Sequence, residues 1–94
     1  GDVHVDLGAR TVTKNGEPVH LTKLEYRLLQ ILIESRGNFL TQRQLLQRVG
    51  GPAYVERPHY LRIYMSRLRA KLEDDPARPK WLLTEVGVGC RLAL

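Results

Sequence analysis

The spacing of hydrophobic residues changes along the chain, and the segment before Leu21 has the spacing of short β-strands. Apolar and polar residues alternate in VHVDL, residues 3–7, as expected for strands with one packed face. Asn15-Gly16 is typical of a two-residue hairpin turn, because both turn positions require a positive φ. We therefore predict an antiparallel sheet here, with a hairpin that passes through Val12 and Val19.

Two helices are predicted next, because each apolar stripe begins directly after a capping box. Thr22 with Glu25, and Thr41 with Gln44, have the spacing in which two side chains satisfy the first free amides of a helix. The apolar residues that follow recur every three or four positions, so one face of each helix is expected to be buried. The segment GGPAYVERP, residues 50–58, is expected to form an irregular connection after the second helix.

A third helix is predicted to begin at Pro58, since proline has no N–H to leave unbonded in a first turn, and to end at about Glu73. Four of its apolar side chains recur at the spacing of one buried face: Leu61, Met65, Leu68 and Leu72. Residues 81–94 contain a glycine-rich turn between two apolar runs, which predicts a β-hairpin. The sequence therefore predicts an α+β domain with an N-terminal antiparallel sheet, three helices and a C-terminal hairpin.

The face of the third helix opposite its apolar stripe is narrow and is flanked by cations. Its centre contains mostly small or apolar residues and one arginine: His59, Ile63, Ser66, Arg67 and Ala70. Its edges contain Arg62 and Arg69 on one side and Tyr60, Tyr64 and Lys71 on the other. The major groove of DNA has the complementary shape, about 12 Å wide with phosphates on both rims. We therefore expect Ile63 to contact thymine methyl groups and Arg67 to donate two hydrogen bonds to guanine.

The positive excess of the chain lies in this helix and the residue before it. The net charge is +5, and residues 57–72 hold five cations and no acid, so the rest of the chain is balanced. Contacts to the DNA backbone are expected from Arg57, Arg62, Tyr64, Arg69 and Lys71. A solvated helix face is the ordinary explanation of such a charge run, but no acid is interleaved here for pairing. RNA or an anionic membrane surface is the alternative partner of the same helix.

Nothing in the sequence has the pattern of a catalytic or metal site. His4, His20 and His59 are dispersed without ligand spacing, and no Ser/His/Asp or Cys/His set is evident. We therefore expect neither enzymatic activity nor a metal or other cofactor. Cys90 is the only cysteine, so an intrachain disulfide is excluded, and it is expected to be a small core residue. No segment approaches the about 20 apolar residues of a membrane span, so we expect a cytoplasmic protein without membrane contact.

Three segments resemble, in order and spacing, the C-terminal effector domain of OmpR/PhoB-type response regulators: LTKLEYRLLQILIESRGNFLTQRQLL, RIYMSRLRAKLEDDP and TEVGVGCRL. The resemblance covers residues 1–94 as one domain. It implies a winged helix-turn-helix fold with a four-stranded N-terminal sheet, in which the C-terminal hairpin is the wing. It also implies a transcriptional regulator that binds direct-repeat DNA half-sites as a tandem homodimer. Within the family the resemblance is strongest to regulators of potassium-transport operons.

The resemblance also implies roles for particular positions. Base-reading sites fall at Ile63 and Arg67. His59 falls at a recognition-helix site that faces the backbone or bases, and we expect it to read bases. Recognition-helix and wing sites near the DNA backbone fall at Tyr60, Tyr64, Arg69 and Thr84. The loop that contacts RNA polymerase in relatives corresponds to Gly51, Pro52, Ala53, Tyr54 and Val55. Tyr54 and Val55 are expected to pack inward, because loop aromatics usually anchor their own loop, with presentation to a partner as the alternative.

Four positions depart from the family's pattern. The first is Arg62, which stands where many relatives carry an acidic residue. Gly50 replaces a tryptophan that is common in the polymerase loop, and Val86 replaces an arginine that many relatives place in the minor groove. Cys90 replaces the usual tyrosine of the wing. The receiver domain and its phosphoacceptor aspartate have no counterpart in these residues. A sensor kinase is therefore expected to act only through a domain outside them.

Overall fold

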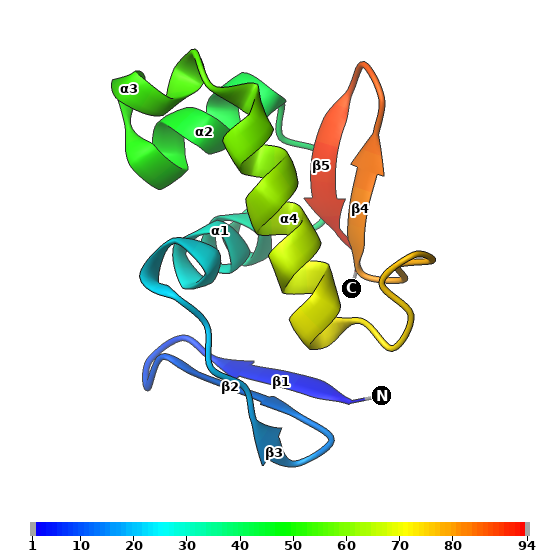
Figure 1. The fold of residues 1–94 in the computed structure, drawn as a ribbon. Helices are drawn as coiled ribbons and strands as arrows, with labels where there is room; N and C mark the ends of the chain where they lie inside the picture. The colour runs from blue at the N-terminus through cyan, green and yellow to red at the C-terminus, as the bar shows by residue number, and fades with distance from the viewer. Residues whose placement is uncertain (1, 94) are drawn as a thin grey trace.

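The computed structural model describes residues 2–93, so the two ends of the predicted domain, residues 1 and 94, lie outside it. Its N-terminal sheet contains β1 (Val3–Asp6), β2 (Thr11–Lys14) and β3 (Glu17–Pro18). Within the same residues four helices follow: α1 (Lys23–Glu34), α2 (Gln42–Gly50), α3 (Pro52–Val55) and α4 (Pro58–Leu72). The last elements are the hairpin strands β4 (Leu82–Glu85) and β5 (Gly89–Leu92), as Figure 1 shows. The predicted α+β class and element order are confirmed.

The N-terminal sheet is antiparallel in the order β1-β2-β3, and its register pairs Val5 with Val12. Asn15 and Gly16 both have positive φ, of 52° and 82°, as the predicted hairpin turn requires. The expected four-stranded sheet is wrong for residues 2–93, which contribute three strands to it. The third strand contains only two residues, although the Val19 amide beyond it still donates to the Val12 carbonyl oxygen at 2.9 Å.

Both predicted capping boxes are present and fix where α1 and α2 begin. Thr22 Oγ1 accepts from the Glu25 amide at 3.3 Å, and Glu25 Oε1 accepts from the Thr22 amide at 3.0 Å. Thr41 and Gln44 make the same pair of bonds at the start of α2. Because each box satisfies amides that a helix leaves free, both starts are defined by local sequence.

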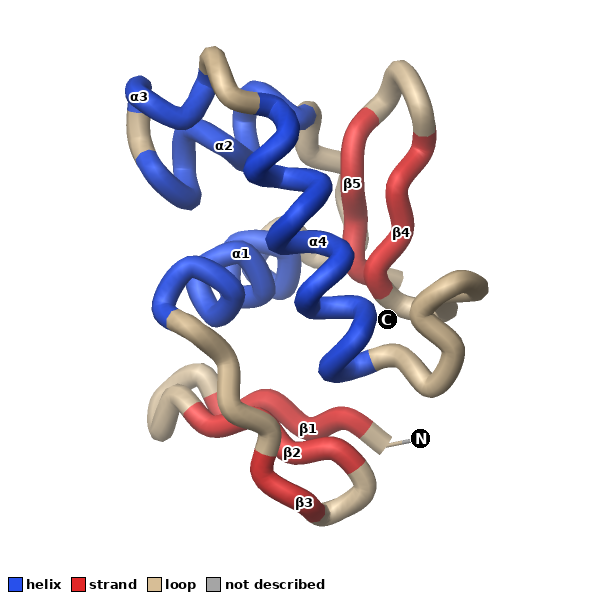
Figure 2. The backbone as a smooth tube through the Cα atoms, in the orientation of Figure 1, coloured by secondary structure: helices blue, strands red, loops and turns tan. Residues whose placement is uncertain are grey.

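The core lies between α1, α2 and α4, with the hairpin closing one side. Its largest fully buried apolar side chains are Leu28, Leu32, Leu45, Leu46, Met65, Leu68 and Leu82. In Figure 2 the hairpin lies along α4 on the side away from α3, and the N-terminal sheet lies beneath α1 and the end of α4. The four apolar residues predicted to anchor α4 are all buried: Leu61, Met65, Leu68 and Leu72. Their burial turns the opposite face of α4 outward.

The connection between α2 and α4 contains a one-turn helix, where sequence analysis expected irregular chain. Gly51 has φ 82°, which permits the sharp turn after α2, and Pro52 occupies the first position of α3. Gly51 and Pro52 end α2 as expected, whereas Gly50 is still the last residue of the helix. The proline then starts a new turn, because its fixed φ suits the beginning of a helix.

Glu73, directly after α4, attaches the hairpin to the helix. Its side chain is 3% exposed, and its two carboxylate oxygens accept the backbone amides of Lys80, Trp81 and Leu82 at 2.8, 3.0 and 2.8 Å. A buried carboxylate is costly unless its lone pairs are satisfied, and three amide donors satisfy it here. The start of β4 is therefore held at a defined place beside the end of α4.

Glu25 and Lys71 join α1 to α4. The Glu25 side chain is 1% exposed, and its Oε1 lies 2.5 Å from Lys71 Nζ. Burial alone would raise the pKa of this carboxyl, but the hydrogen bonds from Lys71 and Thr22 outweigh that effect. The pKa of Glu25 therefore lies below its usual value of 4.5, and the group is charged at neutral pH.

Glu25→Gln is expected to lower the free energy of unfolding at about pH 7 by about 1–3 kcal/mol, because Lys71 loses its charged partner. A depressed folded-state pKa stabilises the protein above the usual carboxyl pKa, and this stability is lost as pH falls through the folded-state value. The difference in unfolding temperature between the two proteins should therefore shrink between about pH 7 and about pH 3. Thermal unfolding followed by circular dichroism measures it, and a constant difference would contradict the role of Glu25.

Candidate nucleic-acid interface

The outer face of α4 is exposed and free of acids, as its sequence pattern predicts. We call the following exposed residues the recognition face: His59, Arg62, Ile63, Ser66, Arg67 and Ala70. Ile63 is 41% exposed, and among residues 2–93 the other exposed large hydrophobic side chains lie outside helices. Since Ile63 and Arg67 are both exposed, no other part of residues 2–93 covers the face.

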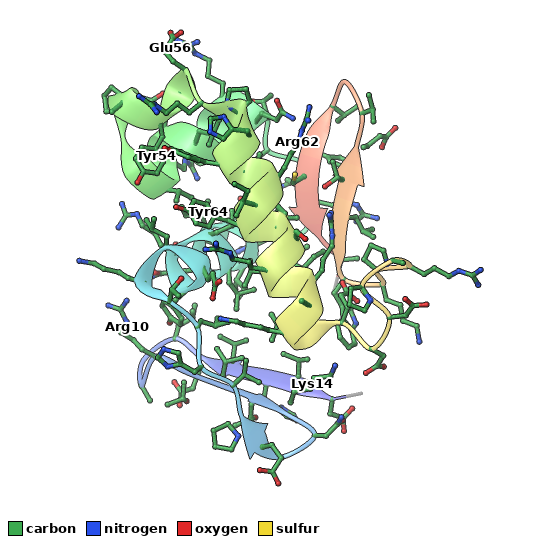
Figure 3. All side chains as sticks on the ribbon, in the orientation of Figure 1. Arg10, Lys14, Tyr54, Glu56, Arg62 and Tyr64 are labelled. Carbon is green, nitrogen blue, oxygen red and sulfur yellow. The ribbon has the colours of Figure 1, made fainter. Side chains whose placement is uncertain are left out.

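Side chains on the two edges of the recognition face point to different neighbours. Figure 3 shows Arg62 on the side of α4 that faces the wing, and Tyr64 on the opposite side, toward α3. Burial raises the pKa of the half-buried Tyr64 hydroxyl, and the nearby Tyr54 raises it further. Tyr64 therefore keeps its proton at neutral pH and can donate a hydrogen bond to a phosphate oxygen.

Arg69 connects α4 to the wing. Its Nε donates to the Leu82 carbonyl oxygen at 2.9 Å, and its Nη2 donates to Thr84 Oγ1 at 2.6 Å. Thr84 Oγ1 also lies 3.4 Å from Cys90 Sγ, across the hairpin. Sequence analysis placed Arg69 and Thr84 separately near the DNA backbone. The structure brings them together, so the wing is set at a fixed position relative to the recognition helix.

The base of the wing is also attached to the loop before α2. Leu40 and Cys90 exchange two backbone hydrogen bonds of 2.8 and 2.9 Å. A Cβ on Gly89 would lie only 2.0 Å from the Leu40 carbonyl oxygen, so no larger residue fits there. In the sequence, Gly89 belongs to the predicted glycine-rich turn, and no local pattern reveals this close approach. Beyond the anchored base, Val86 at the tip is 96% exposed, and Cys90 is buried as predicted.

Lys71 lies outside the recognition face. Its ammonium group is bonded to Glu25 on the side of α4 that packs against α1. Its predicted contact with the DNA backbone stays a prediction, but the lysine already has a structural partner. The periodicity of α4 placed it near the edge of the outer face. It did not reveal the buried carboxylate on another helix.

The predicted polymerase loop is divided between exposed and half-buried residues. Pro52 and Ala53 are exposed, whereas Gly51, Tyr54 and Val55 are half-buried. The inward packing expected for Tyr54 and Val55 is therefore observed.

Among residues 2–93, no group of three His, Cys, Asp or Glu side chains is placed to hold a metal ion. In the same range, no helix has the length and apolar content that a membrane crossing requires. The recognition face and its edges present guanidinium, hydroxyl and apolar groups along one side of α4. Such groups bind phosphates and base edges by hydrogen bonding and shape.

A basic recognition helix, the two helices that support it and an adjoining β-hairpin define a winged-helix DNA-binding domain. The chain matches the family model described as transcriptional regulatory protein, C terminal, over residues 16–92. It belongs to this family, the DNA-binding effector domains of OmpR/PhoB-type response regulators. The family regulates transcription, so the chain is a DNA-binding domain rather than an enzyme.

Two curated relatives are both named as the transcriptional regulatory protein KdpE. The chain is 57% identical over 93 residues to the KDP operon transcriptional regulatory protein KdpE of Escherichia coli (strain K12), covering 99% of this chain and 41% of that protein. It is 51% identical over 87 residues to the transcriptional regulatory protein KdpE of Mycobacterium tuberculosis (strain ATCC 25618 / H37Rv), covering 93% of this chain and 38% of that protein. The chain therefore spans about two fifths of the length of these relatives.

Two solved structures share the fold across nearly the whole chain. The DNA-binding domain of Klebsiella pneumoniae RstA, in complex with the RstA box, has a TM-score of 0.86 and 28% identity, with 99% of this chain and 92% of that chain covered. The response regulator DrrB of Thermotoga maritima, an OmpR/PhoB homolog, has a TM-score of 0.86 and 33% identity, with 98% and 42% covered. The winged-helix prediction is confirmed.

The bond between Arg69 and Thr84 predicts energetic coupling between recognition helix and wing. Arg69→Met and Thr84→Val should each lower the free energy of unfolding. The double variant should be less destabilised than the sum of the two by about 0.5–3 kcal/mol, because both changes remove the same hydrogen bond. Denaturant unfolding of the four proteins measures this coupling. Purely additive effects would show that the bond does not hold the wing.

Proposed function

We propose that this chain is the DNA-reading part of a two-component response regulator that controls potassium-transport genes. The observation that carries the proposal is the exposed, acid-free recognition face of α4 beside an anchored wing. The names of the relatives support the choice of operon. Their greater length supports a receiver domain outside these residues, through which a sensor kinase would act. The protein would work in the cytoplasm, where its DNA lies.

In this proposal the residues of α4 and the wing divide into two groups. Base edges are contacted by His59, Ile63 and Arg67. The DNA backbone is contacted by Arg57, Arg62, Tyr60, Tyr64, Arg69 and Thr84. Lys71 is left out of the second group, because its ammonium group neutralises the buried Glu25 carboxylate. Removal of Lys71 from that pair would leave a buried charge without a partner.

Two copies are proposed to bind direct-repeat half-sites as a tandem homodimer. A single module of this size buries only about 600–1,000 Å² on DNA, which limits its affinity for one half-site. A second copy bound alongside raises the effective affinity without any new base contact. RNA polymerase is a further proposed partner, through the exposed Pro52 and Ala53 of α3.

Selection of bound sequences from random duplex DNA tests the proposal. The unaltered chain should enrich direct repeats at one spacing. Arg67→Lys should lose about 1–3 kcal/mol of discrimination at one base pair per half-site, because lysine cannot donate the bidentate pair that guanine accepts. Equal preference at that position in both selections would contradict base reading by Arg67. Binding of random DNA and RNA with the same affinity would favour the charge-driven alternative.

The salt dependence of affinity distinguishes phosphate contacts from base contacts. Arg62→Gln should make the log–log slope of affinity against salt less steep by about 0.9, the value for one phosphate neutralised on B-DNA. Lys23→Gln, at the exposed start of α1, is the matched control, since it removes the same charge outside the recognition face. Fluorescence anisotropy over a salt series measures both slopes. An equal change in the two variants would mean that only net charge matters.

A further inference from the structure

The first turn of α4 lacks the usual means by which a helix end is fixed. Its N-cap residue, Arg57, makes no side-chain hydrogen bond to a helix amide, although capping normally stabilises such an end. The first fully buried side chain of the helix is Leu61, and of residues 58–60 only the half-buried Tyr60 packs against the core. His59, a proposed base-reading residue, lies in this turn. Its position must depend on other contacts.

Aromatic contacts supply what the cap does not. The Tyr60 ring centroid lies 5.3 Å from that of Tyr54, 4.5 Å from that of His59 and 6.4 Å from that of Tyr64. The Arg57 guanidinium carbon lies 5.9 Å from the Tyr60 ring, and its Nη1 donates to the Tyr60 hydroxyl at 3.4 Å. We call Tyr54, Tyr60 and Tyr64 the tyrosine cluster. Figure 3 shows Tyr54 and Tyr64 on the same side of α4, away from the wing.

The tyrosine cluster packs against Gly50, the last residue of α2, through Tyr54. A Cβ at this position would lie 2.3 Å from Cδ2 and 2.4 Å from Cγ of Tyr54, so the ring rests directly on the glycine backbone. Gly50 has no positive φ that would demand glycine, which leaves this close approach as the reason that a side chain does not fit. The contact fixes α3 against α2, and the Tyr54 ring in turn contacts α4.

We propose that Tyr54 is a positioning residue that holds the first turn of α4, and with it His59, in place for contact with DNA. The proposal that Tyr54 anchors the helix depends only on contacts within the domain. Its consequence for base contact rests on the proposed function. The proposal gives the half-buried Tyr54 a role inside the domain, in place of a direct contact with polymerase. It also makes Gly50 part of the DNA-binding apparatus, although this residue lies outside the recognition face.

Amide hydrogen exchange of the free chain tests the anchoring without DNA. In an α-helix the amides of Arg62, Ile63 and Tyr64 donate to the carbonyls four residues earlier, in the first turn. Tyr54→Ala should speed their exchange about threefold to tenfold, the range that one aromatic pair contributes. Tyr54→Phe keeps the ring and should retain protection. Unchanged exchange in Tyr54→Ala would overturn the proposal, as would a uniform increase along the whole of α4.

Gly50→Ala gives an independent test, because it displaces the ring without removing it. Alanine favours a helix more than glycine does, so α2 by itself should be stabilised. The proposal nevertheless expects faster exchange in the first turn of α4, since the new Cβ takes the place of the ring. Normal protection there would mean that the ring can leave Gly50 without consequence, and would overturn the proposal.

The proposed effect on DNA binding is tested by finding which base pair of the half-site loses sequence discrimination when Tyr54 is changed. Tyr54→Ala should lower discrimination at the base pair nearest His59 by the same threefold to tenfold, and should leave the base pair contacted by Arg67 unaffected. Full discrimination in a variant whose first turn exchanges faster would overturn the positioning role. If the unaltered chain shows no sequence preference, the proposed function fails instead, and the exchange results still decide whether Tyr54 anchors the helix.

Discussion

The burial of one apolar stripe of α4 determines where every other side chain of that helix points. Leu61, Met65, Leu68 and Leu72 pack against α1 and α2, and a helix offers no freedom to rotate one face independently of the other. Ile63 and Arg67 are therefore exposed because their neighbours are buried. The exposed face is a consequence of core packing, so a change in the core that rotates α4 would also change which side chains the helix presents.

Sequence alone predicted the features of the site that depend on local periodicity. The capping boxes, the start at Pro58 and the exposed face of α4 follow from residues within a few positions of one another, and the structure confirms them. The N-terminal sheet was overestimated by one strand for residues 2–93, because the expectation came from the family and not from a pattern in these residues. These features were predictable because helix capping and hydrophobic periodicity depend on residues that lie close together in the sequence.

The contacts that hold the site together could not be predicted, because each joins residues far apart in the chain. Arg69 was assigned to DNA from its place on the helix, and only the packing of the hairpin reveals its bonds to Leu82 and Thr84. Lys71 likewise has a partner 46 positions away, in Glu25. At positions 50 and 89 the only local sign of a special backbone contact was the glycine itself. It indicated a turn in both places, whereas the structure shows close packing.

The attachment of the wing separates its base from its tip. Backbone bonds between Leu40 and Cys90, together with the bonds of Arg69, hold the lower half of the hairpin, and none of these bonds involves residues 86–88. Apart from Gly87, whose φ of 82° favours glycine, the tip can therefore vary in sequence without disturbing the fold beneath it. The tip and the scaffold beneath it are therefore under separate constraints, and a change in one leaves the other intact.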